Sequence, residues 1–179
     1  MTDLDTPITP LDLLRRLENL LRPGTVQAVD HATARVRVAS GELLTNWLPW
    51  FERRAGSTRT WSPPTVGEQC LLLCPGGEMA SGLVLVGLYS DNQPAPADGP
   101  ELHRTAYADG AIIEYDQAAH TLSATLPAGA TVSITAPGGI TLDTPTVTVT
   151  GDVVASGISL VNHVHGGTQP GGGTTGGPQ

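Results

Sequence analysis

The chain has 179 residues, of which 39% are hydrophobic, so it is long enough for one ordinary domain or two small ones. Its nine basic residues are all Arg, all lie at or before Arg104, and are outnumbered by seventeen acidic residues, giving a net charge of −8. Because nucleic acids and anionic lipid surfaces are bound largely through Lys and Arg, this balance argues against either as the main partner.

The N-terminus does not have the pattern of a secretory signal peptide. Charged side chains interrupt its leucine-rich stretch, and a small-residue cleavage site is missing. We therefore expect synthesis and first assembly in the cytoplasm. The sequence also has no apolar run of the length that a membrane-spanning helix needs.

Residues 1–24 contain the first predicted element, a short amphipathic helix. Thr9 can cap its N-terminus, and Pro10 suits the first helical position. Pro23-Gly24 is expected to end it. The apolar residues at helical spacing are Leu11, Leu14, Leu17, Leu20 and Leu21. Such a helix covers its own domain or docks on a partner, and both interpretations stay open.

Residues 25–90 are predicted to form a small closed barrel of the OB type, because short strands replace the helical period. The loop Phe51–Pro64 between two strands is long and polar, and we interpret it as a contact surface. The predicted strands are Thr25–Asp30, Thr33–Ala39, Leu43–Trp50, Glu68–Cys74 and Gly82–Tyr89.

Two cysteines, Cys70 and Cys74, lie within one predicted strand. Four residues of strand separate them by about 13 Å, which is beyond the reach of a disulfide bond. We expect two small buried hydrophobic residues rather than a redox or metal site.

Residues 91–104 are predicted to be a proline-rich linker, and residues 105–161 a narrow stem of short strands. A hairpin of Ala111–Tyr115 and His120–Leu126 opens the stem. Beyond it, apolar residues alternate with Thr and Ser, and small turns recur about every ten residues. The turns are expected at residues 127–129 and 137–139.

The stem cannot bury a core by itself. Residues 117–162 contain only thirteen Val, Ile and Leu side chains and no aromatic residue, and a lone chain would leave its strand edges open. Three copies wound about one axis would turn the aliphatic faces inward and form a β-prism. Periodicity alone also allows a two-fold sandwich.

Residues 162–179 are predicted to be a metal-binding apex with a Gly-rich tail. His163 and His165 share one face of an extended chain, about 6 to 7 Å apart. Three chains would supply six imidazoles, an octahedral set. Imidazole suits Zn, Cu, Fe and Ni, and six ligands disfavour structural Zn. The alternative is an exposed histidine pair in a disordered tail.

Several motifs in this order resemble the baseplate assembly protein V family, the central spikes of contractile-tailed P2-like phages, and the related spikes of R-type pyocins. The matching segments are Gly24-Thr25-Val26, Trp47-Leu48-Pro49-Trp50, Trp61, Val66-Gly67-Glu68-Gln69, Leu71-Leu72-Leu73, Pro75-Gly76-Gly77-Glu78, Tyr89-Ser90-Asp91, Asp109-Gly110-Ala111, Glu114-Tyr115, Ile140-Thr141-Leu142-Asp143-Thr144-Pro145 and His163-Val164-His165-Gly166-Gly167.

The resemblance implies an all-β homotrimer: an OB domain bound to the baseplate hub protein, a triple-stranded intertwined β-helix, and an apex where His163 and His165 of each chain bind one iron ion per trimer. It further implies a place at the tip of the tail baseplate, in a virion or a pyocin particle assembled in the host cytoplasm. On sheath contraction, such a spike pierces the bacterial outer membrane.

Two other classes of function compete with this interpretation. One is an enzyme, either a His-metal hydrolase or a glycosidase with paired carboxylates; the other is an OB-type module that binds carbohydrates or oligonucleotides. We find no third metal ligand and no readable carboxylate pair, so we predict no catalytic residues. The scattered acidic residues are Glu42, Glu52, Glu68, Glu78 and Glu114.

Overall fold

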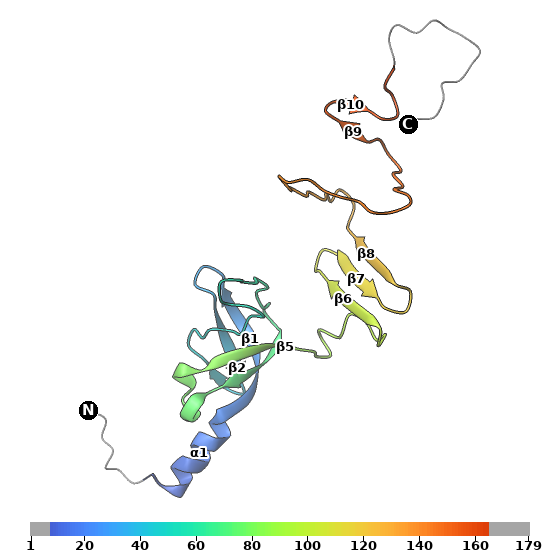
Figure 1. Ribbon diagram of the computed structural model, residues 1–179. Coiled ribbons are helices and arrows are strands. Elements are labelled where there is room, and N and C mark those ends of the chain that lie inside the picture. Colours follow the sequence, from blue (N-terminus) through green and yellow to red (C-terminus); the bar gives the residue numbers. More distant parts are fainter. Residues whose placement is uncertain (1–7, 165–179) are drawn as a thin grey trace, which may run out of the picture. The chain divides into compact units, whose positions relative to one another are not determined.

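The computed structural model describes residues 8–164 of the chain (Figure 1). Contacts divide the chain into two compact units, with the boundary between Ala130 and Thr131. The first unit holds one helix and two antiparallel sheets, and the second holds a two-stranded hairpin. The described part of the chain contains no helix that is long and apolar enough to span a membrane.

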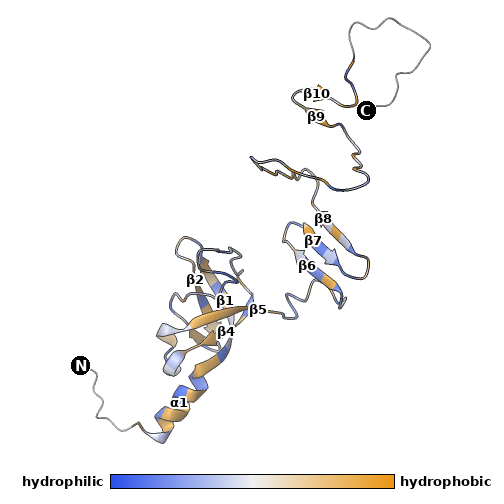
Figure 2. Cartoon of the chain, in the orientation of Figure 1, coloured by the Kyte–Doolittle hydropathy of each residue, from blue (hydrophilic) through white to orange (hydrophobic). Residues whose placement is uncertain are grey.

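Helix α1, Pro10–Leu20, begins as the sequence predicts. The Thr9 hydroxyl oxygen accepts a hydrogen bond from the Asp12 backbone N–H at 3.1 Å, and Pro10 occupies the first turn. The predicted end at Pro23-Gly24 is wrong, because the chain enters strand β1 directly after Leu20. Both hydrophobic and hydrophilic residues line this helix (Figure 2).

A five-stranded antiparallel sheet forms the larger part of the first unit, in the order β3-β2-β1-β4-β5. Two short 3-10 turns, η1 (Pro75–Gly77) and η2 (Met79–Ser81), connect the last two strands. The strands are β1 (Leu21–Asp30), β2 (Arg35–Ser40), β3 (Leu43–Leu44), β4 (Gln69–Leu73) and β5 (Leu83–Leu88).

The third predicted strand, Leu43–Trp50, is interrupted after Leu44. The hydroxyl of Thr45 takes the place of a backbone acceptor by accepting a hydrogen bond from the Val38 N–H at 2.9 Å. The chain rejoins β2 at Leu48, and Trp50 then pairs with Val84 of β5. This last pairing joins the two edges of the sheet and closes it into a barrel.

The barrel core is small and aliphatic. Gly24 is required where β1 crosses it, since a Cβ atom there would lie 2.4 Å from Val38 Cγ1. Cys70 and Cys74 are free thiols inside this core, as predicted, and burial raises the pKa of Cys70 to about 11. The buried residues are Val26, Val36, Val38, Leu48, Cys70, Leu72, Cys74 and Val84.

A second antiparallel sheet of three strands has the order β6-β7-β8, with β6 at Leu102–Ala106, β7 at Ile112–Asp116 and β8 at Thr121–Thr125. The hairpin β7–β8 was predicted. Strand β6 was not, because we assigned most of its residues to the linker. An ion pair between Arg104 and Glu114 links it to β7.

The stem strands predicted beyond the hairpin β7–β8 do not form within one chain. The segment 126–153 has no strand, although the turns predicted there are present: Ala130 N–H donates to Pro127 O, and Gly139 N–H donates to Ala136 O. Among residues 131–164, only β9 (Val154–Ala155) and β10 (Ile158–Ser159) pair with each other. A segment with alternating apolar residues that has no partner strand in its own chain needs strand edges from another chain.

Candidate functional site

Strands β9 and β10 form a tight hairpin that ends a few residues before His163. Ser156 and Gly157 connect them, with φ values of 50° and 81°. Positive φ at both central residues is typical of a two-residue type I′ turn, whose twist suits a β-hairpin. The turn thus fixes the direction in which the chain leaves β10.

The chain after β10 is held against the hairpin by a series of backbone donors. Leu160 N–H donates to Val153 O at 2.8 Å, and Val161 N–H donates to the Asp152 carboxylate at 3.1 Å. Asn162 N–H donates to the Ser159 hydroxyl at 2.8 Å. These bonds place residue 163 next to the end of β10.

The imidazole of His163 is oriented by backbone carbonyl groups. Its Nδ1 lies 3.0 Å from Ser159 O and 3.1 Å from Leu160 O. A carbonyl oxygen only accepts, so the Nδ1 nitrogen carries the proton and the lone pair of the neutral ring lies on Nε2. Metal-binding histidines commonly show this arrangement, with one ring nitrogen on a carbonyl and the other on the ion.

Only one of the two predicted metal ligands therefore lies within the described residues. His163 is exposed, while His165 lies outside the described residues. Within residues 8–164, no three side chains of His, Cys, Asp or Glu come close enough to hold a metal ion. The iron site with His163 and His165 stays a prediction.

Asp152 is a structural residue of this site that the sequence analysis missed. The Ser159 hydroxyl and then the Val161 backbone N–H donate to its carboxylate and lower its pKa from the ordinary value of 3.8. The signal was an Asp a few residues before a Ser-Gly turn, a position that suits a carboxylate capping the returning chain.

We expect acid to loosen this segment. Because the folded-state pKa of Asp152 is depressed, its contribution to stability is complete above about 3.8 and is lost as the pH falls through the lower folded value. An NMR titration of the Val161 amide should show a transition below pH 3.8. In Asp152→Asn that transition should be absent, and a transition that persists would contradict the assignment.

Large aliphatic side chains in the segment 122–153 are exposed in a single chain. Ile134, for example, is 71% exposed. They occupy the even positions to Leu142 and odd positions from Val147, which is the alternation seen in the sequence. The other exposed members are Leu122, Leu126, Val132, Ile140, Leu142, Val147, Val149 and Val153. Monomeric proteins rarely expose so much aliphatic surface, and such surface marks an interface.

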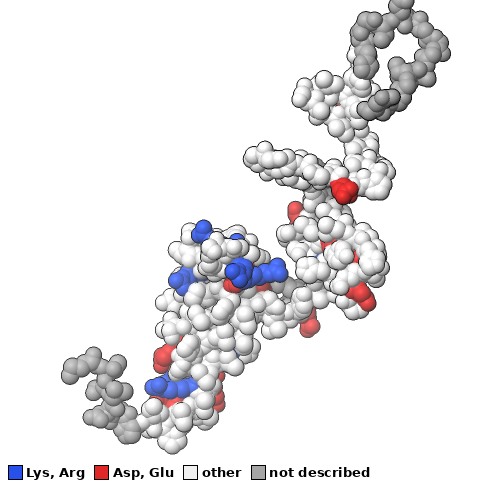
Figure 3. All heavy atoms as spheres, viewed as in Figure 1, with Lys and Arg blue, Asp and Glu red and all other residues white. Residues whose placement is uncertain are grey.

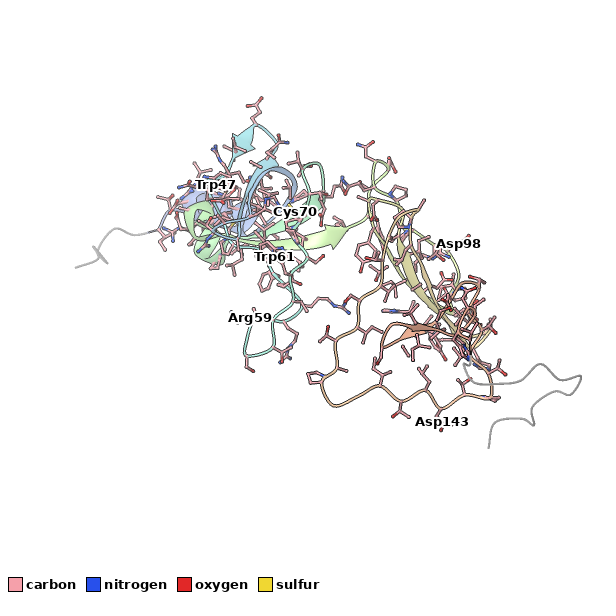
Figure 4. The ribbon with its side chains drawn as sticks, turned by 90° about the horizontal axis from the view of Figure 1, so that it is seen from above. Trp47, Arg59, Trp61, Cys70, Asp98 and Asp143 are labelled. Carbon is pink, nitrogen blue, oxygen red and sulfur yellow. The ribbon has the colours of Figure 1, made fainter. Side chains whose placement is uncertain are left out.

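The loop after Trp50 folds over one side of the barrel and encloses a cleft of about 400 Å³. Trp50 and Trp61 form one wall, with ring centroids 5.7 Å apart and planes inclined at 52°. Arg59 and Trp61 lie on this loop in Figure 4. Arg side chains gather over the barrel on the face shown in Figure 3.

The remaining candidate residues have structural positions. His31 and His120 lie in exposed turns, and His103 lies on the exposed face of β6, positions typical of ordinary surface residues. Glu68 accepts hydrogen bonds from the backbone N–H groups of Thr65 and Gly87. The carboxylates of this part of the chain therefore hold backbone in place.

Comparison with known proteins agrees with the barrel and the tip. Residues 22–89 match the type VI secretion system/phage-baseplate injector OB domain. Residues 157–179 match the GpV Apex motif. The predicted OB fold is thus confirmed, and the barrel is the OB domain of a secretion-system or phage-baseplate injector.

A curated relative narrows this class. The chain is 40% identical over 138 residues to the spike protein of Escherichia phage P2. This match covers 77% of the chain and 64% of the relative, which is less than two thirds of its length. The chain belongs to the P2-like phage baseplate spike proteins.

Proposed function

We propose that this chain is one subunit of a homotrimeric central spike. The OB barrel attaches the spike to the baseplate hub protein, and the stem projects to a metal-bound apex. On sheath contraction the spike pierces the bacterial outer membrane. It belongs at the tail baseplate tip of a virion or a pyocin particle and is assembled in the host cytoplasm.

The exposed alternating side chains of the segment 122–153 are the observation that carries this proposal. A two-residue period places them on one face of an extended chain, and Thr and Ser occupy most of the opposite face. Three such faces can enclose a shared aliphatic interior and supply one another's strand edges. The product is a narrow, stiff rod, which is the shape that transmits an axial force.

The ring of His163 is suited to the metal that the family resemblance implies. His163 presents a ring whose Nδ1 is bonded to backbone carbonyls, the tautomer that binds a metal through Nε2. Three copies of His163 and His165 would hold one iron ion in an octahedral shell. Bound iron would cross-link the three chain ends, and the hairpin β9–β10 would keep each His163 in position.

We propose no catalytic activity for the chain. The curated relative carries the name of a spike protein, and the acidic side chains described above stabilise loops and strands. A mechanical role is therefore the one that we propose for the chain.

Immunogold electron microscopy of contractile-tailed particles that contain this chain tests the proposal. Antibodies raised against the full chain should label the distal end of the baseplate in particles with an extended sheath. Contracted particles should carry the label beyond the end of the tail tube. Label on the sheath or on the head would contradict a central spike.

A further inference from the structure

The cleft beside the Phe51–Pro64 loop is a preformed site. Glu52 holds the loop by accepting hydrogen bonds from the Arg53 N–H at 2.9 Å, the Thr60 hydroxyl at 2.8 Å and the Ser62 N–H at 2.9 Å. These bonds, of which the one from Arg53 contributes most, lower the pKa of Glu52. The carboxylate thus stays ionised and ties both sides of the loop together.

A second set of bonds closes the tip of the loop. Thr60 N–H donates to Arg54 O at 3.0 Å, and the Arg54 N–H donates to the Thr60 hydroxyl at 3.1 Å. Ala55 and Arg59 form an isolated β-bridge. A loop fixed in this way loses little conformational entropy when a ligand binds, which favours recognition.

The cleft carries positive charge that the barrel does not neutralise. Arg35, Arg54 and Arg59 line it, and within residues 8–164 their guanidinium groups have no ion-pair partner. Elsewhere in the same range, Arg15 pairs with Asp12 and Arg104 pairs with Glu114. The oxygens of Glu52 are already occupied by the loop.

An aromatic surface lies beside these charges. Trp50 packs against the barrel core, whereas Trp61 is 58% exposed at the mouth of the cleft. Exposed Trp next to Arg is the composition of interface hot spots, where a rigid ring buries apolar area and a guanidinium binds a carboxylate through two hydrogen bonds. The ligand chemistry is therefore an apolar side chain flanked by carboxylates.

We propose that this cleft is the contact through which the barrel binds an acidic segment of the baseplate hub protein. Carboxylates of that segment pair with Arg54 and Arg59, and an apolar side chain lies against Trp61. This inference rests on the proposed function, which makes the hub the partner. A nucleic acid fits less well, because the chain has a net charge of −8 and the cleft gathers only a few cations.

Titration of the purified hub protein with the full chain tests the inference. Arg54→Ala with Arg59→Ala should weaken hub binding by about 30-fold or more, since two charge-assisted contacts are lost. Arg54→Lys with Arg59→Lys should recover part of the affinity. Arg53→Ala is the control: it removes one positive charge from the same loop at a residue that does not line the cleft, and it should change affinity less than threefold.

A photo-cross-linker in place of Trp61 identifies the segment that is bound. The cross-linked hub peptide should be rich in Asp and Glu. Unchanged hub binding by the double Ala variant, or a cross-link to a basic segment, would overturn the cleft assignment and leave hub attachment intact. A wild-type chain that does not bind the hub would overturn hub attachment itself. Tight binding of a twelve-nucleotide oligo-dT, lost in the double Ala variant, would show that the cleft binds nucleic acid and would overturn the proposal of an acidic segment.

Discussion

The full chain in solution is expected to have three times the chain mass of 18.5 kDa, and Ile134→Asp is expected to abolish this trimer. Ile134 is 71% exposed in one chain but belongs to the face that we place inside the stem. An unpaired carboxylate there costs at least about 2 kcal/mol per chain. Three copies cost about 6 kcal/mol, which weakens association by about four orders of magnitude. Light scattering during size-exclusion chromatography measures the mass.

Thr135→Asp is the matched control for that experiment. It adds the same charge one residue along, on the face that the alternation turns toward solvent. Its trimer should persist, with a small change in thermal stability at most. A monodisperse wild-type monomer, or equal dissociation in both variants, would remove the basis for a three-fold stem.

Replacing both apex histidines, His163→Ala with His165→Ala, is expected to remove the bound metal. The wild-type trimer should contain one ion for every three chains, and the variant less than a tenth of that amount. The reason is that all six proposed ligands disappear together. Elemental analysis of protein purified without a histidine tag gives the ratio, and light scattering should still show a trimer held by the stem.

The control for metal loss removes two other imidazoles. His31→Ala with His103→Ala changes the same residue type at exposed positions of the barrel turn and of β6. Its metal content should equal that of the wild type. A double apex variant that retains its metal would refute the site. A wild-type protein with a metal other than iron would leave the site in place and change only the identity of the ion.

Strands with a clear local pattern could be predicted from the sequence. Arg35–Ser40 alternates between buried residues and residues that are exposed or half-buried, and both Cys70 and Cys74 lie in the core as expected. The third barrel strand was predicted too long. Its interruption depends on a tertiary contact, since the Thr45 hydroxyl takes a hydrogen bond that a backbone carbonyl would otherwise accept. No local propensity indicates such a substitution.

The end of helix α1 and the position of β6 were missed for related reasons. Pro23 and Gly24 are common helix terminators, yet both lie in β1, where the close approach of Val38 requires the glycine. Strand β6 is short and follows a proline-rich segment, so its pairing with β7 decides its structure. Partner strands elsewhere in the chain override the local signal.

The candidate site was predicted in part. The spacing of His163 and His165 is a local pattern that could be seen in the sequence. The contacts that orient the His163 ring depend on the conformation of the Ser156-Gly157 turn and on the Asp152 carboxylate, so periodicity could not indicate them. The proposed winding of the stem lies further beyond local patterns, because it would depend on contacts between chains.

All three tryptophans of the chain, Trp47, Trp50 and Trp61, belong to the barrel and its loop, and the stem has no aromatic residue after Tyr115. Tryptophan fluorescence therefore reports on the barrel, the part that we propose to bind the hub. Unfolding of the segment after Tyr115 would not change this fluorescence. A dye that is meant to follow the stem must therefore be introduced downstream of Tyr115.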